Sequence, residues 1–127
     1  LAGQLADRIG FLRALRLALL VQAAAVGLLA LPSGTTGLAV SSIVVGALMP
    51  AMVVLVLGRV SELAPPGQSS AAWSMATVAF AVGQAAGAYG LSWLFARTGD
   101  YGLLFALGAA AILLALLIDL ALARRRI

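Results

Sequence analysis

The run GLLFALGAAAILLALLIDLALA, residues 102–123, contains one charged side chain and leads directly into Arg124, Arg125 and Arg126. A helix of about 20 apolar residues is long enough to cross the hydrocarbon layer of a lipid bilayer. The run therefore predicts a membrane-spanning helix that ends at a charged membrane surface.

Three earlier segments have the same apolar character, and short turn-rich or charged segments separate them. The predicted spans are 14–31, 36–57, 69–96 and 102–123. Because the joining segments are short, neighbouring helices are expected to be antiparallel. No run alternates between apolar and polar residues as a strand of a membrane barrel does. The predicted fold class is all-α transmembrane, with four membrane-spanning helices and no soluble domain.

The composition points to lipid as the main solvent of this chain. Its 127 residues are 64% hydrophobic and 9% charged, whereas soluble domains carry about 25% charged residues. The sequence has no cysteine and no histidine, which removes disulfides, thiolate chemistry and the commonest metal ligands. No pair of acids, Ser–His combination or glycine-rich phosphate loop suggests catalysis. We therefore expect no enzyme activity, no metal and no cofactor.

The positions of the arginines predict the orientation in the membrane. Every cation is an arginine and each lies near the end of an apolar run, so we expect membrane lipid, and no nucleic acid, as a partner. Four spans place seven arginines on one side and only Arg97 on the other. Positive residues favour the cytoplasmic side, so both ends of this segment are predicted to be cytoplasmic, in a bacterial inner membrane. The seven are Arg8, Arg13, Arg16, Arg59, Arg124, Arg125 and Arg126.

The segment 69–96 carries a stripe of glycines. Gly83, Gly87 and Gly90 lie within about 60° of arc on a helix. Small residues allow two helix backbones to approach closely in a membrane. We expect this stripe to pack against a neighbouring helix, in preference to forming a homodimer contact.

A second face of the same segment is polar, because Ser70, Ser74, Thr77 and Gln84 share it. Gln84 falls near the middle of the span, where an amide faces protein or a cavity and not lipid. Two interpretations stay open: Gln84 bonds a neighbouring helix, or it lines a substrate path.

Two other membrane positions are unusual for an apolar helix. Pro50 lies within the segment 36–57, removes a backbone donor and is expected to bend or loosen the helix. Asp119 lies close to the predicted cytoplasmic interface. Either it is a proton-coupling carboxylate, or it is an interfacial acid offset by Arg124, Arg125 and Arg126. We favour the interfacial acid, because the cost of a charge falls towards the interface.

The first ten residues, LAGQLADRIG, carry a recognisable motif. Gly3, Asp7, Arg8 and Gly10 have the spacing G-x-x-x-D-R-x-G. This resembles the cytoplasmic signature loop of the major facilitator superfamily, of which one copy joins helices two and three and a weaker copy joins helices eight and nine. Four spans follow, so the resemblance implies helices nine to twelve of a twelve-helix transporter, with residues 1–10 as a loop cut from a longer protein. Phe11 departs from the pattern, which usually has a cation there.

The rest of the chain is similar to the YbfB/YjiJ-like group of that superfamily. In that group helix eleven carries a characteristic polar and glycine pattern. The matching residues here are Thr77, Phe80, Gln84, Gly87 and Tyr89.

The resemblance implies a mechanism in which two six-helix halves rock about a central site. Helix ten would line the cavity, which nominates Ser41, Ser42, Met49 and Pro50, and helix eleven would flank it, which adds Thr77 and Gln84. Helices nine and twelve would be outer support, and Asp7 and Arg8 would contact the opposite half. The implied partners are a small-molecule substrate and the N-terminal helices of the same protein.

Two alternatives to such a transporter stay open. One is a complete small four-helix exporter that works as a dimer, although the first span lacks the buried carboxylate of such exporters. The other is a membrane scaffold subunit that does not transport.

Overall fold

The computed structural model describes residues 2–124. These residues form α-helices joined by short turns. Its helices are α1 (Ala2–Ile9), α2 (Phe11–Leu28), α3 (Gly34–Leu63), α4 (Ser69–Thr98) and α5 (Tyr101–Arg124). The last four are each long and apolar enough to cross a membrane. The predicted all-α transmembrane fold with four spanning helices is confirmed.

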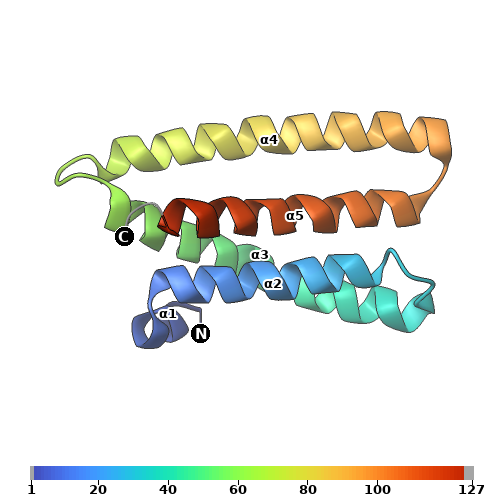
Figure 1. Cartoon of the computed structure of the whole chain (residues 1–127), viewed down its shortest axis with the longest axis horizontal. Helices are drawn as coiled ribbons and strands as arrows, with labels where there is room; N and C mark the ends of the chain where they lie inside the picture. Colours follow the sequence, from blue (N-terminus) through green and yellow to red (C-terminus); the bar gives the residue numbers. More distant parts are fainter. Residues whose placement is uncertain (1, 125–127) are drawn as a thin grey trace.

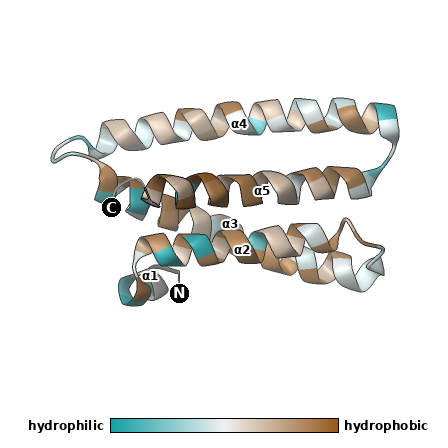
Figure 2. Ribbon diagram, in the orientation of Figure 1, coloured by the Kyte–Doolittle hydropathy of each residue, from teal (hydrophilic) through white to brown (hydrophobic). Residues whose placement is uncertain are grey.

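The helices form a layered arrangement with α2 near its centre. Figure 1 shows α3 and α5 lying beside α2, while α4 runs along the outer side of α5. Helix α1, the α3–α4 loop and the end of α5 lie at one end of the molecule, and the α2–α3 and α4–α5 turns lie at the other. In Figure 2 hydrophilic colour marks α1, the beginning of α2 and the α4–α5 turn, while α5 is mostly hydrophobic.

Residues 1–10 were predicted to be a loop, and this prediction is wrong for the described part. Ala2–Ile9 form α1, since alanine, leucine, glutamine and arginine all favour helix. The helix stops at Gly10, whose φ of 87° lies in the left-handed region that glycine adopts without strain. Ala6 is buried in a cluster with Ala14 and Leu55. The turn at Gly10 therefore folds α1 back onto α2 and α3.

The buried residues of α2 are all alanines. They are Ala14, Ala18, Ala23 and Ala25. On the α5 side, a methyl group added at Gly27 would lie 3.6 Å from Cβ of Ala109. Small side chains let helices approach closely in a membrane, where dispersion contacts replace the hydrophobic effect as the driving force. The alanines of α2 thus explain why it can contact α1, α3 and α5 at once.

Phe11, the position that departs from the signature pattern, has a specific place in the structure. It is half-buried beside the cluster of Ala6, Ala14 and Leu55. A Cβ added at Gly58 of α3 would overlap ring carbons Cδ1 and Cε1 of Phe11. The ring therefore lies directly on the α3 backbone at Gly58, and the aromatic residue joins the beginning of α2 to the end of α3.

Helix α4 differs from the other long helices because none of its residues is buried. Every residue from 77 to 90 is exposed. The contacts of α4 with α3 and α5 leave its central part uncovered by the described residues.

Asp100 begins α5 by capping it. Its Oδ1 accepts a hydrogen bond from the backbone N–H of Leu103 at 3.2 Å, which satisfies one of the unpaired donors at a helix N-terminus. We expect Asp100→Ala to lower the free energy of unfolding by about 1 kcal/mol. Denaturant unfolding of the full-length natural product in detergent micelles measures this. Asp100→Asn is the matched control, because asparagine caps as well as aspartate; an equal loss in both variants would contradict the capping role.

Candidate functional site

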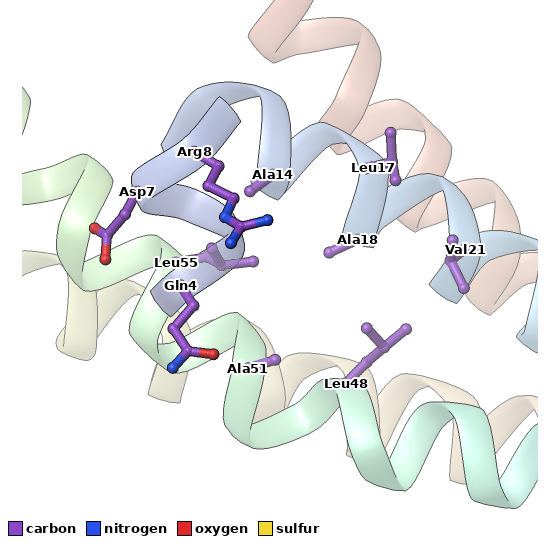
Figure 3. Close-up of a pocket in the computed structure, with 10 residues that line it drawn as sticks. All are labelled: Gln4, Asp7, Arg8, Ala14, Leu17, Ala18, Val21, Leu48, Ala51 and Leu55. Atoms are coloured by element: carbon purple, nitrogen blue, oxygen red, sulfur yellow. The ribbon is translucent and has the colours of Figure 1, made fainter. Parts of the chain in front are cut away.

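The signature residues lie at the α1–α2 junction. Gly3, Asp7 and Arg8 belong to α1, and Gly10 forms the turn that follows. Asp7 and Arg8 are exposed and their side chains point in different directions in Figure 3. Among the described residues neither is ion-paired. Both remain free at one end of the molecule to contact a further element.

A groove of about 880 Å³ opens beside these residues, between α1, α2 and α3. One end is polar and the remainder is apolar, and Figure 3 shows the lining side chains. This groove could not be predicted from the sequence, because its lining comes from three helices and most of the lining residues are ordinary apolar positions. The lining residues are Gln4, Asp7, Arg8, Ala14, Leu17, Ala18, Val21, Leu48, Ala51 and Leu55.

The residues nominated on α3 divide between two faces. Ser41 is buried, with an exposed fraction of 1%, while Ser42, Met49 and Pro50 are exposed. Ser41 lies one turn after Gly37, which is also buried; a Cβ added at Gly37 would overlap the Ser33 side chain and come 4.0 Å from the Leu28 side chain at the end of α2. The structure therefore places Ser42, Met49 and Pro50 on open surface and separates Ser41 from them. Helix α3 continues without interruption through Pro50.

The nominated residues of α4, Thr77 and Gln84, are both exposed. The Thr77 hydroxyl donates to the carbonyl oxygen of Trp73 at 2.9 Å, and the Ser74 hydroxyl donates to that of Ser70 at 3.0 Å. These hydroxyls satisfy their hydrogen-bonding needs within α4 itself. Gln84 is exposed, and its amide makes no hydrogen bond to any of the described residues.

The glycine stripe is also on open surface. A Cβ added at Gly83, Gly87 or Gly90 would meet no atom within 4 Å. No described residue packs against the stripe, so its role in helix packing stays a prediction about elements beyond the described residues.

An ion pair joins α2 to α5. Arg16 Nε donates to Asp119 Oδ2 at 2.7 Å, and the two side chains are 24% and 30% exposed. Arg124, Arg125 and Arg126 were predicted to offset this acid; the side chain of Arg124 and the whole of Arg125 and Arg126 lie outside what the structure describes, and the described partner of Asp119 is Arg16. The pairing of Arg16 with Asp119 could not be predicted from local sequence, because 103 positions separate the two residues.

Comparison with known proteins gives the family. The family described as Uncharacterised MFS-type transporter YbfB matches residues 1–120 of the chain. The chain belongs to this family. No match was found among curated proteins or among solved structures.

Membership in the YbfB family accounts for the main features of the structure. The four spanning helices are part of a larger MFS transporter fold, the chain is an integral membrane protein in contact with lipid, and the family's role is membrane transport. The family is one of transporters and not of enzymes. Within residues 2–124 no group of His, Cys, Asp and Glu is arranged to hold a metal ion.

The two ends of the helices in this YbfB-family chain differ in the contacts that their arginines make. Arg59, near the end of α3, pairs with Glu62 at 2.9 Å, at the same end of the molecule as α1 and the beginning of α2 (Figure 1). At the opposite end Arg97 lies over the Trp93 ring, 4.7 Å from its centroid. Among the described residues, most arginines therefore lie at the end of the molecule that holds α1, and Arg97 lies at the opposite end.

Proposed function

We propose that this chain is the C-terminal portion of a secondary transporter that moves a small solute by alternating access, with α2 to α5 as helices nine to twelve. The observation that carries the proposal is the open surface of α4. A membrane helix that exposes every residue from 77 to 90 places Gln84 against whatever surrounds the chain. An amide near the middle of a bilayer is tolerated against protein or a water-filled cavity, so α4 flanks a further part of the same protein.

Helix α3 supplies the second wall of the proposed cavity. Ser42, Met49 and Pro50 are exposed, on a helix that buries Ser41 and Leu55. An open surface that carries the Ser42 hydroxyl among apolar side chains is suited to a path for a weakly polar solute, while the buried residues hold α3 against α2. We assign Ser42, Met49, Thr77 and Gln84 to the path.

The arginine-rich end is proposed to be cytoplasmic, in an inner membrane, with both ends of this segment on that side. There Asp7 and Arg8, exposed and without ion-pair partners among the described residues, would contact the opposite half of the transporter in one of its two states. The N-terminal helices of the same protein would supply that half and the remainder of the substrate site.

Accessibility of introduced cysteines tests alternating access without knowledge of the substrate. The chain has no cysteine, so single cysteines can be placed in the full-length natural product after removal of any others. We expect Ser42→Cys and Gln84→Cys to react with a membrane-impermeant maleimide added from either side, because each would face water in one of the two states. Only a thiol that can ionise in water reacts readily.

Leu114→Cys is the matched control. Leu114 is 58% exposed but lies on α5, a proposed outer helix, where it would face lipid and stay unlabelled. Labelling at 42 and 84 from one side only would contradict alternating access. No labelling at either site would favour a scaffold that does not transport.

A further inference from the structure

Pro50 leaves one backbone acceptor of α3 without its usual helical donor. In an α-helix the N–H of residue 50 donates to the carbonyl oxygen of residue 46, but proline has no N–H. Because α3 continues through Pro50, the residue that loses this donor is Gly46. The proline ring also conflicts sterically with the same carbonyl group, which favours an outward tilt of the Gly46 oxygen.

The Gly46 carbonyl group lies on open surface, near the middle of the apolar part of α3. Gly46 is exposed, and a Cβ added there would meet no atom within 4 Å. It lies about 18 Å along the helix from Gly34 and about 20 Å before Arg59, the first charged residue of α3. A backbone oxygen without a donor is costly at that depth in a membrane, so a donor from outside α3 is needed there.

A hydroxyl group accompanies this oxygen on the same face of α3. Ser42 lies one turn before Gly46, about 40° around the helix, and is exposed. Its hydroxyl makes no hydrogen bond to any described residue, in contrast to the hydroxyls of Ser74 and Thr77 on α4. The face therefore offers a backbone acceptor and a hydroxyl one turn apart.

Apolar side chains complete the face. Met49 and Val53 lie within about 60° of Gly46 around the helix and are 54% and 55% exposed. No residue of α3 before Arg59 carries a charge, so a charged ligand would find no compensation on this face. A few placed polar groups among apolar side chains suit a small neutral molecule.

We propose that the Gly46 carbonyl oxygen accepts a hydrogen bond from the transported solute, which is uncharged and carries an N–H or O–H group next to an apolar portion. The Ser42 hydroxyl would bond the same polar group, and Met49 and Val53 would contact the apolar portion. A site built to bond such a group rejects an analogue that lacks the donor. This contact rests on the proposed function, which places a solute path along α3.

Two amides that differ in their N–H groups test the contact. Met49→Cys, as the single cysteine of the full-length natural product, reports occupation of the face through its rate of labelling by a maleimide. We expect benzamide, whose N–H groups donate, to slow this labelling. N,N-dimethylbenzamide, which has no N–H, should need about tenfold more for the same protection, because it leaves the acceptor unpaired. Equal protection by the two amides, or no protection by benzamide, would overturn the proposal.

Pro50→Ala supplies a second test, because alanine gives the Gly46 oxygen its helical donor. In the Met49→Cys background it should weaken protection by benzamide about fivefold, the usual value of one neutral hydrogen bond. The midpoint of denaturant unfolding should shift upwards in the same variant, since alanine favours helix far more than proline. The weaker protection by N,N-dimethylbenzamide should not change. An equal loss for both amides would indicate a general distortion of the face and overturn the proposal.

Val40→Ala is the matched control on the same helix. Val40 is 48% exposed and lies about 120° around α3 from Gly46. Its replacement should leave protection by benzamide unchanged. A loss equal to that of Pro50→Ala would contradict a contact at Gly46, as would full protection in Pro50→Ala.

The outcomes separate this contact from the proposed function. If Met49→Cys is not labelled in the absence of amide, both the solute path and the contact are contradicted. Labelling from one side of the membrane only would contradict alternating access and leave the comparison of the two amides valid. Protection by sodium chloride, but by neither choline chloride nor benzamide, would identify a cation at the carbonyl oxygen and overturn the solute assignment.

Discussion

Replacing Asp119 by alanine should lower the free energy of unfolding by about 2 kcal/mol, a value between those of exposed and buried ion pairs. The substitution leaves the Arg16 guanidinium partly buried without its carboxylate, in a pair that is 24% and 30% exposed. Removing one partner of such a pair costs more than removing both, because the remaining charge is left without compensation. Denaturant unfolding of the full-length natural product in detergent micelles measures the loss.

A double-mutant cycle isolates the interaction of this pair. Arg16→Ala/Asp119→Ala should be less destabilised than the sum of the two single variants, since it leaves no unpaired charge. The exchanged pair Arg16→Asp/Asp119→Arg should recover part of the stability. Additive losses would show that the 2.7 Å contact contributes no coupling between α2 and α5.

Placing a methyl group at Gly58 is expected to have an effect of similar size. Gly58→Ala should lower the free energy of unfolding by about 1–3 kcal/mol, the usual cost of overpacking. The added Cβ would overlap the Phe11 ring, and the ring lies among half-buried neighbours that restrict its movement. The same unfolding experiment reports it.

Shortening the side chain at position 11 supplies the control. In a Phe11→Ala background, Gly58→Ala should be close to neutral or stabilising, because the overlap is gone and alanine favours helix over glycine. Gly46→Ala, on the same helix with no atom within 4 Å of the added Cβ, should also be tolerated. A full loss in the Phe11→Ala background would contradict the ring contact.

The spanning helices could be predicted from the sequence because lipid imposes one requirement on every spanning segment, about 20 apolar residues with internal backbone hydrogen bonds. Contacts between helices follow no such local rule. Nothing near Asp119 in the sequence indicates Arg16, and nothing near Phe11 indicates Gly58. The loop predicted for residues 1–10 rested on the resemblance of the motif to a signature loop, although most residues of α1 favour helix.

The sequence indicated which residue types the candidate site contains, but it indicated less well which of them lie on the same surface. Helical periodicity placed Gln84 on the polar face of α4, and its exposure agrees with a role at a surface beyond the described residues. The same reasoning grouped Ser41 with Ser42, although adjacent residues on a helix differ by about 100° and the structure buries only Ser41. The groove beside Arg8 required the positions of three helices at once.

The absence of any buried residue in α4 has a consequence for motion. Displacing this helix relative to α2, α3 and α5 would break no buried packing within the described residues, and its backbone hydrogen bonds travel with it as a helix. Movements of low energetic cost occur in elements with few buried apolar contacts. Within the described residues the alanine-lined α2 packs against α3 and α5, so any restraint on α4 beyond its contacts with α3 and α5 has to come from the further part of the protein that it is proposed to flank.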